Sequence, residues 1–121
     1  RACSIDDSYA SPAVSLCTDV NGILQIDGLA LKQWMDYKIN ILSGVKDFQI
    51  RYTATRDSEI TIYRVDENGN ETALQTIALP STASKTAWTT LTESFTPEAG
   101  EQVLRLKCTK GLPRINWFKL K

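Results

Sequence analysis

The stretch "DFQIRYTA" (residues 47–54) decides the fold, because its apolar side chains recur at every second position. The apolar set is Phe48, Ile50, Tyr52 and Ala54, and Gln49, Arg51 and Thr53 stand between its members. Successive side chains of a β-strand point to opposite sides, so this alternation is typical of a strand with one buried face. We therefore expect a half-buried strand here.

The same two-residue period extends to both sides of this stretch. It recurs in "MDYKINI" (35–41), "EITIYRV" (59–65) and "VLRLKC" (103–108), and no segment shows a sustained helical repeat. Turn residues separate these segments, and Asn68-Gly69 between two of them is a hairpin signal. About eight to ten short strands with regular turns predict a two-sheet antiparallel sandwich. Its predicted core contains Phe48, Ile50, Ile60, Ile62, Leu104 and Leu106.

The composition excludes some classes of function but does not identify the function itself. The chain has 121 residues, which predicts one domain over residues 1–121. It carries 14 basic and 14 acidic residues, so no basic excess suggests nucleic acid as a partner. No apolar run approaches the roughly 20 residues of a membrane helix. The sequence therefore predicts a protein that binds neither nucleic acid nor membranes.

The sequence offers little support for a catalytic or redox function. Histidine is absent, which removes the usual general base and any Ser–His–Asp site. Carboxylates are plentiful, but a glycosidase needs two of them facing each other across a cleft, and no motif shows such a pair. The three cysteines have no C-x-x-C spacing. Either Cys3 pairs with Cys17 and leaves Cys108 as a buried thiol, or all of them are free thiols.

"DENGNETALQTI" (66–77) begins like a calcium-binding loop, with oxygen-bearing residues at alternate positions. It then fails, because Glu71 stands where the sharp turn needs glycine and Ile77 stands where a bidentate glutamate should close the shell. We expect the tip of a hairpin here.

Trp34 is the most informative aromatic residue. Trp34 is followed at every second position by Asp36, Lys38 and Asn40, so in a strand it lies with them on the polar face. A tryptophan on a polar face is either covered by a neighbouring loop or offered to a ligand. Sugars suit such a ring, because their C–H faces stack on it while their hydroxyls bond to polar groups nearby. Both readings stay open on this evidence.

The order of five segments resembles carbohydrate-binding module family 6. These segments are "QWMDYKINI", "FQIRYTA", "LPSTASKTAWTTL", "AGEQVLRLKCTKG" and "INWFKL". The resemblance covers residue 4 to the end and implies a jelly-roll sandwich of the galactose-binding-like kind. It also implies a non-catalytic, monomeric module attached to the catalytic domain of a secreted enzyme that degrades polysaccharide.

In the family, a Tyr and a Trp in the loops at one end of the sandwich clasp a sugar, and an Asn bonds to its hydroxyls. The matching positions here hold Gly28, Lys85 and Arg114, so all three groups are replaced. The loop site is then either lost or rebuilt around Lys85 and Arg114, which would suit a carboxylated or sulfated sugar. The alternative is that both cations only reach into water.

Some family members have a second site on the concave sheet face, around the tryptophan that Trp34 matches. The resemblance therefore supports Trp34 as a candidate ligand-binding residue, and its strand parity adds Asp36, Lys38 and Asn40. It also implies a structural Ca²⁺, whose oxygen ligands would come from Asp6 or Asp7, Asp19 or Asn21, and Asn116. Our prediction is a module that binds an oligosaccharide or polysaccharide on that face or at a rebuilt loop site. The alternative is a structural sandwich that has lost sugar binding.

Overall fold

The computed structural model describes residues 14–16, 24–26 and 28–121. In this part the chain forms nine strands and no helix, which are β1 (Val14–Leu16), β2 (Leu24–Ile26), β3 (Trp34–Ile41), β4 (Asp47–Thr53), β5 (Ser58–Val65), β6 (Glu71–Leu79), β7 (Thr89–Ser94), β8 (Gly100–Lys110) and β9 (Arg114–Leu120). The predicted all-β class is confirmed. The described residues include no helix that is long and apolar enough to cross a membrane.

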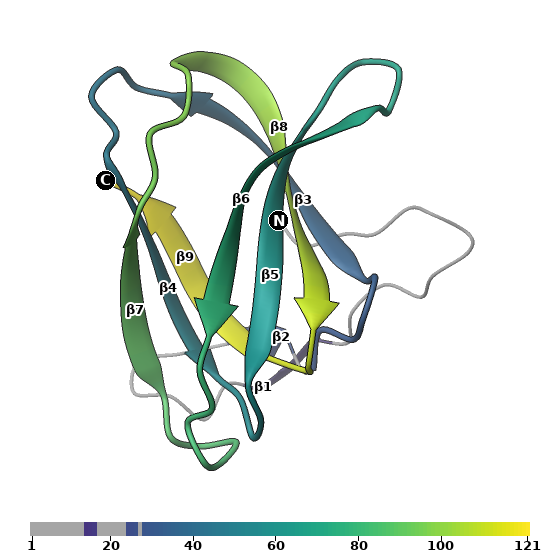
Figure 1. The fold of residues 1–121 in the computed structure, drawn as a ribbon, viewed down its shortest axis with the longest axis vertical. Coiled ribbons are helices and arrows are strands. Elements are labelled where there is room, and N and C mark those ends of the chain that lie inside the picture. Colours follow the sequence, from purple (N-terminus) through teal and green to yellow (C-terminus); the bar gives the residue numbers. More distant parts are fainter. Residues whose placement is uncertain (1–13, 17–23, 27) are drawn as a thin grey trace.

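The strands form two antiparallel sheets that face each other (Figure 1). One sheet has the order β1-β2-β9-β4-β7 and the other has the order β3-β8-β5-β6. From β7 onward each strand lies in the sheet opposite to the one before it, so the chain crosses the core repeatedly. This is the predicted two-sheet sandwich, with the crossing connections of a jelly roll.

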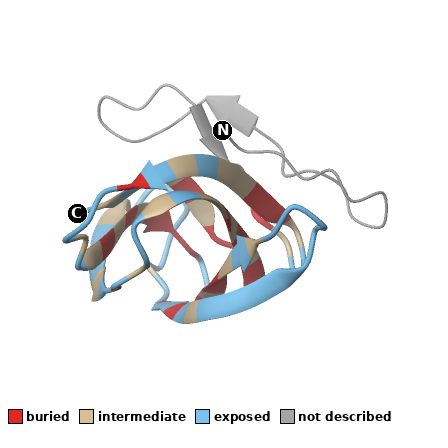
Figure 2. Ribbon diagram, turned by 90° about the horizontal axis from the view of Figure 1, so that it is seen from above, coloured by how far each residue is buried: buried red, intermediate tan, exposed pale blue. Residues whose placement is uncertain are grey.

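The core lies between the sheets, on the faces that the two-residue period selects. All six predicted core residues are at most 1% exposed. Figure 2 shows buried residues on the surfaces that the sheets turn toward each other and exposed residues outside. Aromatic rings join the two sheets, since Phe118 stacks on Phe48 at 5.6 Å and meets Tyr37 edge to face at 4.7 Å. Cys108 is a buried free thiol, and its burial raises the pKa.

Antiparallel pairing gathers the loops at two ends. The loop end, as we call it, consists of residues 28–33, 54–57, 80–88 and 111–113, and it lies at the bottom of Figure 1. Residues 42–46, 66–70 and 95–99 connect strands at the opposite end. There the predicted hairpin tip is confirmed, because Asp66 closes the turn by accepting hydrogen bonds from the Asn68 and Asn70 amides, both at 2.9 Å.

Candidate functional site

The loop end contains the three positions that the resemblance matches to sugar-binding groups. Gly28 precedes β3, Lys85 lies in loop 80–88, and Arg114 opens β9 opposite Thr53. Gly28 has a φ of +79°, a left-handed conformation that glycine adopts without strain, and Leu112 packs against it at 3.5 Å from where a Cβ would stand. Lys85 is exposed and Arg114 is half-buried. All three positions therefore lie at one end of the sandwich, and their part in binding stays a prediction.

Loop 80–88 is tied to loop 54–57 at its base. The Ser81 amide donates to Asp57 Oδ1 at 3.0 Å, and the Thr82 amide donates to the Ala54 carbonyl at 2.7 Å. The Ala54 amide donates in return to Thr82 Oγ1 at 3.1 Å. The Tyr52 hydroxyl also donates to the Pro80 carbonyl at 2.7 Å. These hydrogen bonds fix the loop before it reaches its tip.

A pocket of about 460 Å³ lies beneath this loop, against the edge strand β7. It combines an aromatic ring system with short hydroxyl side chains, and its lining is Tyr52, Pro80, Ser81, Thr82, Ala87, Trp88, Thr89, Thr90 and Leu91. Sequence analysis did not select Trp88 as a site residue. The signal was available in "SKTAWTTL", a tryptophan between a polar loop and a hydroxyl-rich strand start. Neither Lys85 nor Arg114 lines this pocket.

The second candidate surface is the outer face of the four-stranded sheet. Trp34 and Asp36 lie on this face, as their parity predicted, opposite Lys107 and Arg105 of β8. Lys38 and Asn40 continue the same row and are exposed. Trp34 itself is only 3% exposed, and the Arg105 guanidinium lies 4.4 Å from its ring centroid. A glycan could stack on this ring only after the side chains above it moved, so binding at Trp34 stays a prediction.

Ion pairs lock Arg105 in place over the ring. Its Nε and Nη2 atoms donate to the two carboxylate oxygens of Asp36 at 2.7 and 2.8 Å, and Nη1 donates to Glu71 at 3.1 Å. Lys107 Nζ lies 2.7 Å from the same Glu71 oxygen, Oε2, and 5.4 Å from the Trp34 ring centroid. The hydrogen bond to Asp36, above all, raises the pKa of Arg105. The two cations beside the Trp34 ring, Arg105 and Lys107, are therefore already neutralised by the chain's own carboxylates.

The predicted calcium site falls mostly outside the described residues. Asp6, Asp7, Asp19 and Asn21 lie there, and only Asn116 is described. Asn116 is the extra residue of a β-bulge, because Arg51 pairs with Trp117 while the next residue, Tyr52, pairs with Ile115. Bulges redirect a side chain out of the regular alternation, which suits a ligand-donating amide. The described part of the chain holds no cluster of three or more His, Cys, Asp or Glu side chains that could bind a metal.

Comparison with known proteins gives evidence on both the family and the fold of this chain. Residues 1–121 match the family described as "Carbohydrate binding module (family 6)". The chain belongs to carbohydrate-binding module family 6. The resemblance of segment order found in the sequence is thereby confirmed. No curated protein sequence matches this family 6 module significantly.

Solved structures share the fold of this family 6 module. A carbohydrate-binding module of Cellvibrio mixtus lichenase 5A, in complex with cellotriose, superposes with a TM-score of 0.78 at 23% identity, over 91% of this chain and 86% of that one. A β-1,3-glucan-binding module from Bacillus halodurans gives 0.80 at 18% identity, over 91% and 85%. An arabinoxylan arabinofuranohydrolase from Bacillus subtilis gives 0.77 at 14% identity, over 92% of this chain but only 24% of that one.

Proposed function

We propose that this family 6 module binds a glycan at the loop end, in the pocket beneath loop 80–88, and performs no catalysis itself. The observation that carries the proposal is the pocket's lining, which combines Trp88 with the hydroxyl-bearing residues Ser81, Thr82 and Thr90. Sugars offer C–H faces to an aromatic ring and hydroxyls to polar groups. The base of the loop is held by hydrogen bonds between Ala54 and Thr82, so little conformational freedom is lost on binding.

The structural relatives suggest which glycans to test first. The C. mixtus module was solved with cellotriose and the B. halodurans module is described as binding β-1,3-glucan. Polymers of β-linked glucose are therefore the first candidates. Lys85 and Arg114 stand at the same end, so a carboxylated or sulfated glycan would gain charge-assisted contacts that a neutral one lacks.

The decisive experiment starts with a glycan array on the isolated domain and continues with calorimetry on the selected glycan. Trp88→Ala should lower affinity by about twofold to tenfold, since aromatic stacking contributes about 0.5–1.5 kcal/mol. The matched control is Trp117→Ala, because Trp117 lies on β9, outside the pocket, with Lys119 Nζ 4.9 Å from its ring centroid. An equal loss of glycan affinity in both variants would contradict binding in the pocket. If the array selects no glycan, the structural-sandwich alternative replaces this proposal.

Two further parts of the proposal concern the setting of the module. We place it outside the cytoplasm, joined to the catalytic domain of a polysaccharide-degrading enzyme. The B. subtilis enzyme supports this, since the matching region is about a quarter of a larger glycoside hydrolase. Binding of the native, full-length protein from culture medium to an insoluble glycan is the test. Recovery only from the cytoplasmic fraction would contradict it.

We also propose a structural Ca²⁺ near Asn116, with Asp6 or Asp7 and Asp19 or Asn21 as the other oxygen donors. Because a ligand of the native state alone stabilises by mass action, Ca²⁺ should raise the melting temperature, by an amount equivalent to about 2.7 kcal/mol at a hundredfold excess over Kd. Calorimetric melting with Ca²⁺, with Mg²⁺ and with chelator is the measurement. Equal melting in all three, with no calcium found by elemental analysis, would exclude the site.

A further inference from the structure

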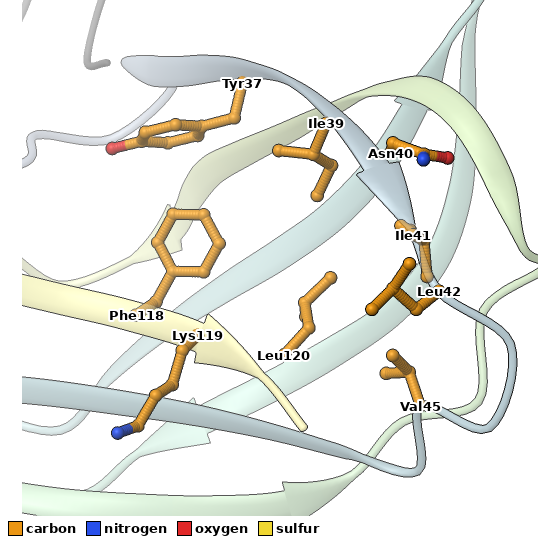
Figure 3. Close-up of a pocket in the computed structure, with 9 residues that line it drawn as sticks. All are labelled: Tyr37, Ile39, Asn40, Ile41, Leu42, Val45, Phe118, Lys119 and Leu120. Atoms are coloured by element: carbon orange, nitrogen blue, oxygen red, sulfur yellow. The ribbon is translucent and has the colours of Figure 1, made fainter.

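Two pockets of this module differ in the chemistry of their walls. Apolar side chains predominate in a pocket of about 420 Å³ between β3 and β9, and Figure 3 shows Ile39, Phe118 and Leu120 pointing toward one another across it. Sugar hydroxyls buried among such side chains would lose their hydrogen bonds to water without replacement. The pocket beneath loop 80–88, by contrast, has five residues with a hydroxyl group in its lining. The direction of their hydrogen bonds therefore determines which ligands this pocket can hold.

Three of the five hydroxyl protons are already used inside the protein. Tyr52, Ser81 and Thr82 each donate to a backbone carbonyl group, at 2.7, 3.3 and 3.0 Å respectively. A carbonyl oxygen only accepts and a hydroxyl has one proton, so toward a ligand these three oxygens act as acceptors. Backbone amides occupy one lone pair on Ser81 and one on Thr82, which leaves each oxygen a second one. Burial and the charge of Asp57 raise the pKa of Tyr52, so its phenol keeps the proton that it donates.

The backbone N–H groups at the base of the loop are used in the same way. The Ser81 amide donates to Asp57 Oδ1 at 3.0 Å, and the Thr82 amide donates to the Ala54 carbonyl at 2.7 Å. Pro80 has no N–H group to offer. The bonds that anchor the loop therefore also occupy its donors. At this part of the lining, a ligand meets oxygen lone pairs.

The part of the lining that belongs to β7 has the opposite character. Thr90 Oγ1 accepts a hydrogen bond from the Arg51 guanidinium at 3.3 Å. A guanidinium group can only donate, so this bond leaves the Thr90 proton available. The pocket thus combines accepting oxygens at the loop with a hydroxyl on β7 that can donate.

We propose that the pocket selects a neutral sugar, whose hydroxyls donate hydrogen bonds to Tyr52, Ser81 and Thr82, and rejects a carboxylate or sulfate group that faces these oxygens. This inference rests on the proposed glycan pocket and names its ligand class. Carboxylate and sulfate oxygens only accept, so against these lone pairs they would lose hydration and gain no donor. Lys85 and Arg114 are not among the lining residues, so their charge acts from outside the pocket.

The test uses cellotriose and its β-1,3-linked counterpart, in which one hydroxyl at a time is replaced by hydrogen or by fluorine. Fluorine can accept a hydrogen bond but cannot donate one, so it separates donating from accepting hydroxyls. In calorimetry on the parent protein, at least one position should lose about threefold to tenfold in affinity with hydrogen and equally with fluorine. The absence of any sensitive position, or rescue by fluorine at every one, would overturn the proposal.

A charged analogue tests the rejection of anions. A triose with a carboxylate in place of each C6 hydroxymethyl group should bind several times more weakly than the neutral triose at about 1 M salt, where the screening length of about 3 Å removes the attraction of Lys85 and Arg114. Tighter binding of the carboxylated triose there would overturn the inference but keep the pocket. Binding of no glycan at all would overturn both.

Protein variants connect the analogues to the loop. At least one of Tyr52→Phe, Ser81→Ala and Thr82→Val should reduce the loss caused by fluorine to below about twofold, because a double-mutant cycle cancels the penalty when the accepting oxygen is gone. Ser84→Ala is the matched control and should keep the full loss, since Ser84 belongs to the same loop but does not line the pocket. If all three variants behave like the control, the protein oxygens are not the acceptors and the proposal is wrong.

Discussion

Two tryptophans of this module, Trp34 and Trp88, stand beside polar side chains, yet their surroundings differ. Around Trp34 the polar groups bind one another, with Arg105 held between Asp36 and Glu71 directly over the ring. Around Trp88 the neighbouring hydroxyls line an open pocket. An aromatic ring among polar groups is therefore no sign of a binding site in itself. Since Ser81, Thr82 and Thr90 also make hydrogen bonds within the protein, what matters is whether side chains of the protein cover the ring.

The largest expected effect is a difference in unfolding free energy between the variants that lack the Trp34 ring and the Trp88 ring. Trp34→Ala removes a side chain that is 3% exposed, and such a truncation costs about 3–5 kcal/mol of unfolding free energy. Trp88→Ala removes a half-buried side chain at a loop, so its cost should be markedly smaller. Urea unfolding of both variants is the measurement. Equal and small losses would mean that Trp34 is not a structural residue, and would reopen its face as a glycan site.

A smaller effect tests the lock on Arg105. Asp36→Asn removes the charge that fixes the guanidinium, and a hydrogen bond to a charged group contributes about 1.5–3 kcal/mol. The substitution should lower the unfolding free energy by about that amount, because the Arg105 side chain is only 11% exposed. The control is Glu98→Gln, which affects an exposed ion pair whose atoms, on Glu98 and Arg64, lie 3.8 Å apart. Asp57→Asn is not suitable as a control, because Asp57 anchors loop 80–88. A loss in Asp36→Asn no greater than in Glu98→Gln would contradict the lock.

The smallest effect is a pH dependence on the sheet face. Burial alone would raise the pKa of Glu71, but hydrogen bonds and positive charge from Lys107 and Arg105 outweigh it and hold the pKa below its ordinary value of 4.5. A carboxyl whose pKa is lower in the folded state stabilises the fold above about pH 4.5, and this contribution is lost as the pH falls below it. Glu71→Gln should therefore flatten the decline of the melting temperature in that range. Glu67→Gln, in the exposed turn, should follow the parent protein.

Much of the fold could be predicted from the sequence because it depends on local alternation. The period of two gave the buried faces of the strands, and Phe48, Ile50 and Leu104 lie where it placed them. The same parity put Trp34 and Asp36 on one outer face. Segment order then identified the family, which no single residue could do.

The site was harder to predict because it depends on partners distant in sequence. Parity shows which way Trp34 points, but Arg105 comes to lie over its ring through a pairing that spans some seventy positions. The pocket at Trp88 likewise requires loop 80–88 to fold back toward loop 54–57 through the bonds between Ala54 and Thr82. Such contacts leave no periodic signal. The sequence therefore indicated the surfaces, and only the fold shows which of them is open.

The anchoring of loop 80–88 bears on how this module can change during evolution. Ser81 and Thr82 fasten the base of the loop, whereas residues 83–87 are exposed and, in the described part of the chain, hydrogen-bond only within the loop. Replacements at the tip can therefore alter the rim of the pocket without unfastening its base. A family of variants could diverge in ligand preference through those five positions while inheriting one unchanged scaffold.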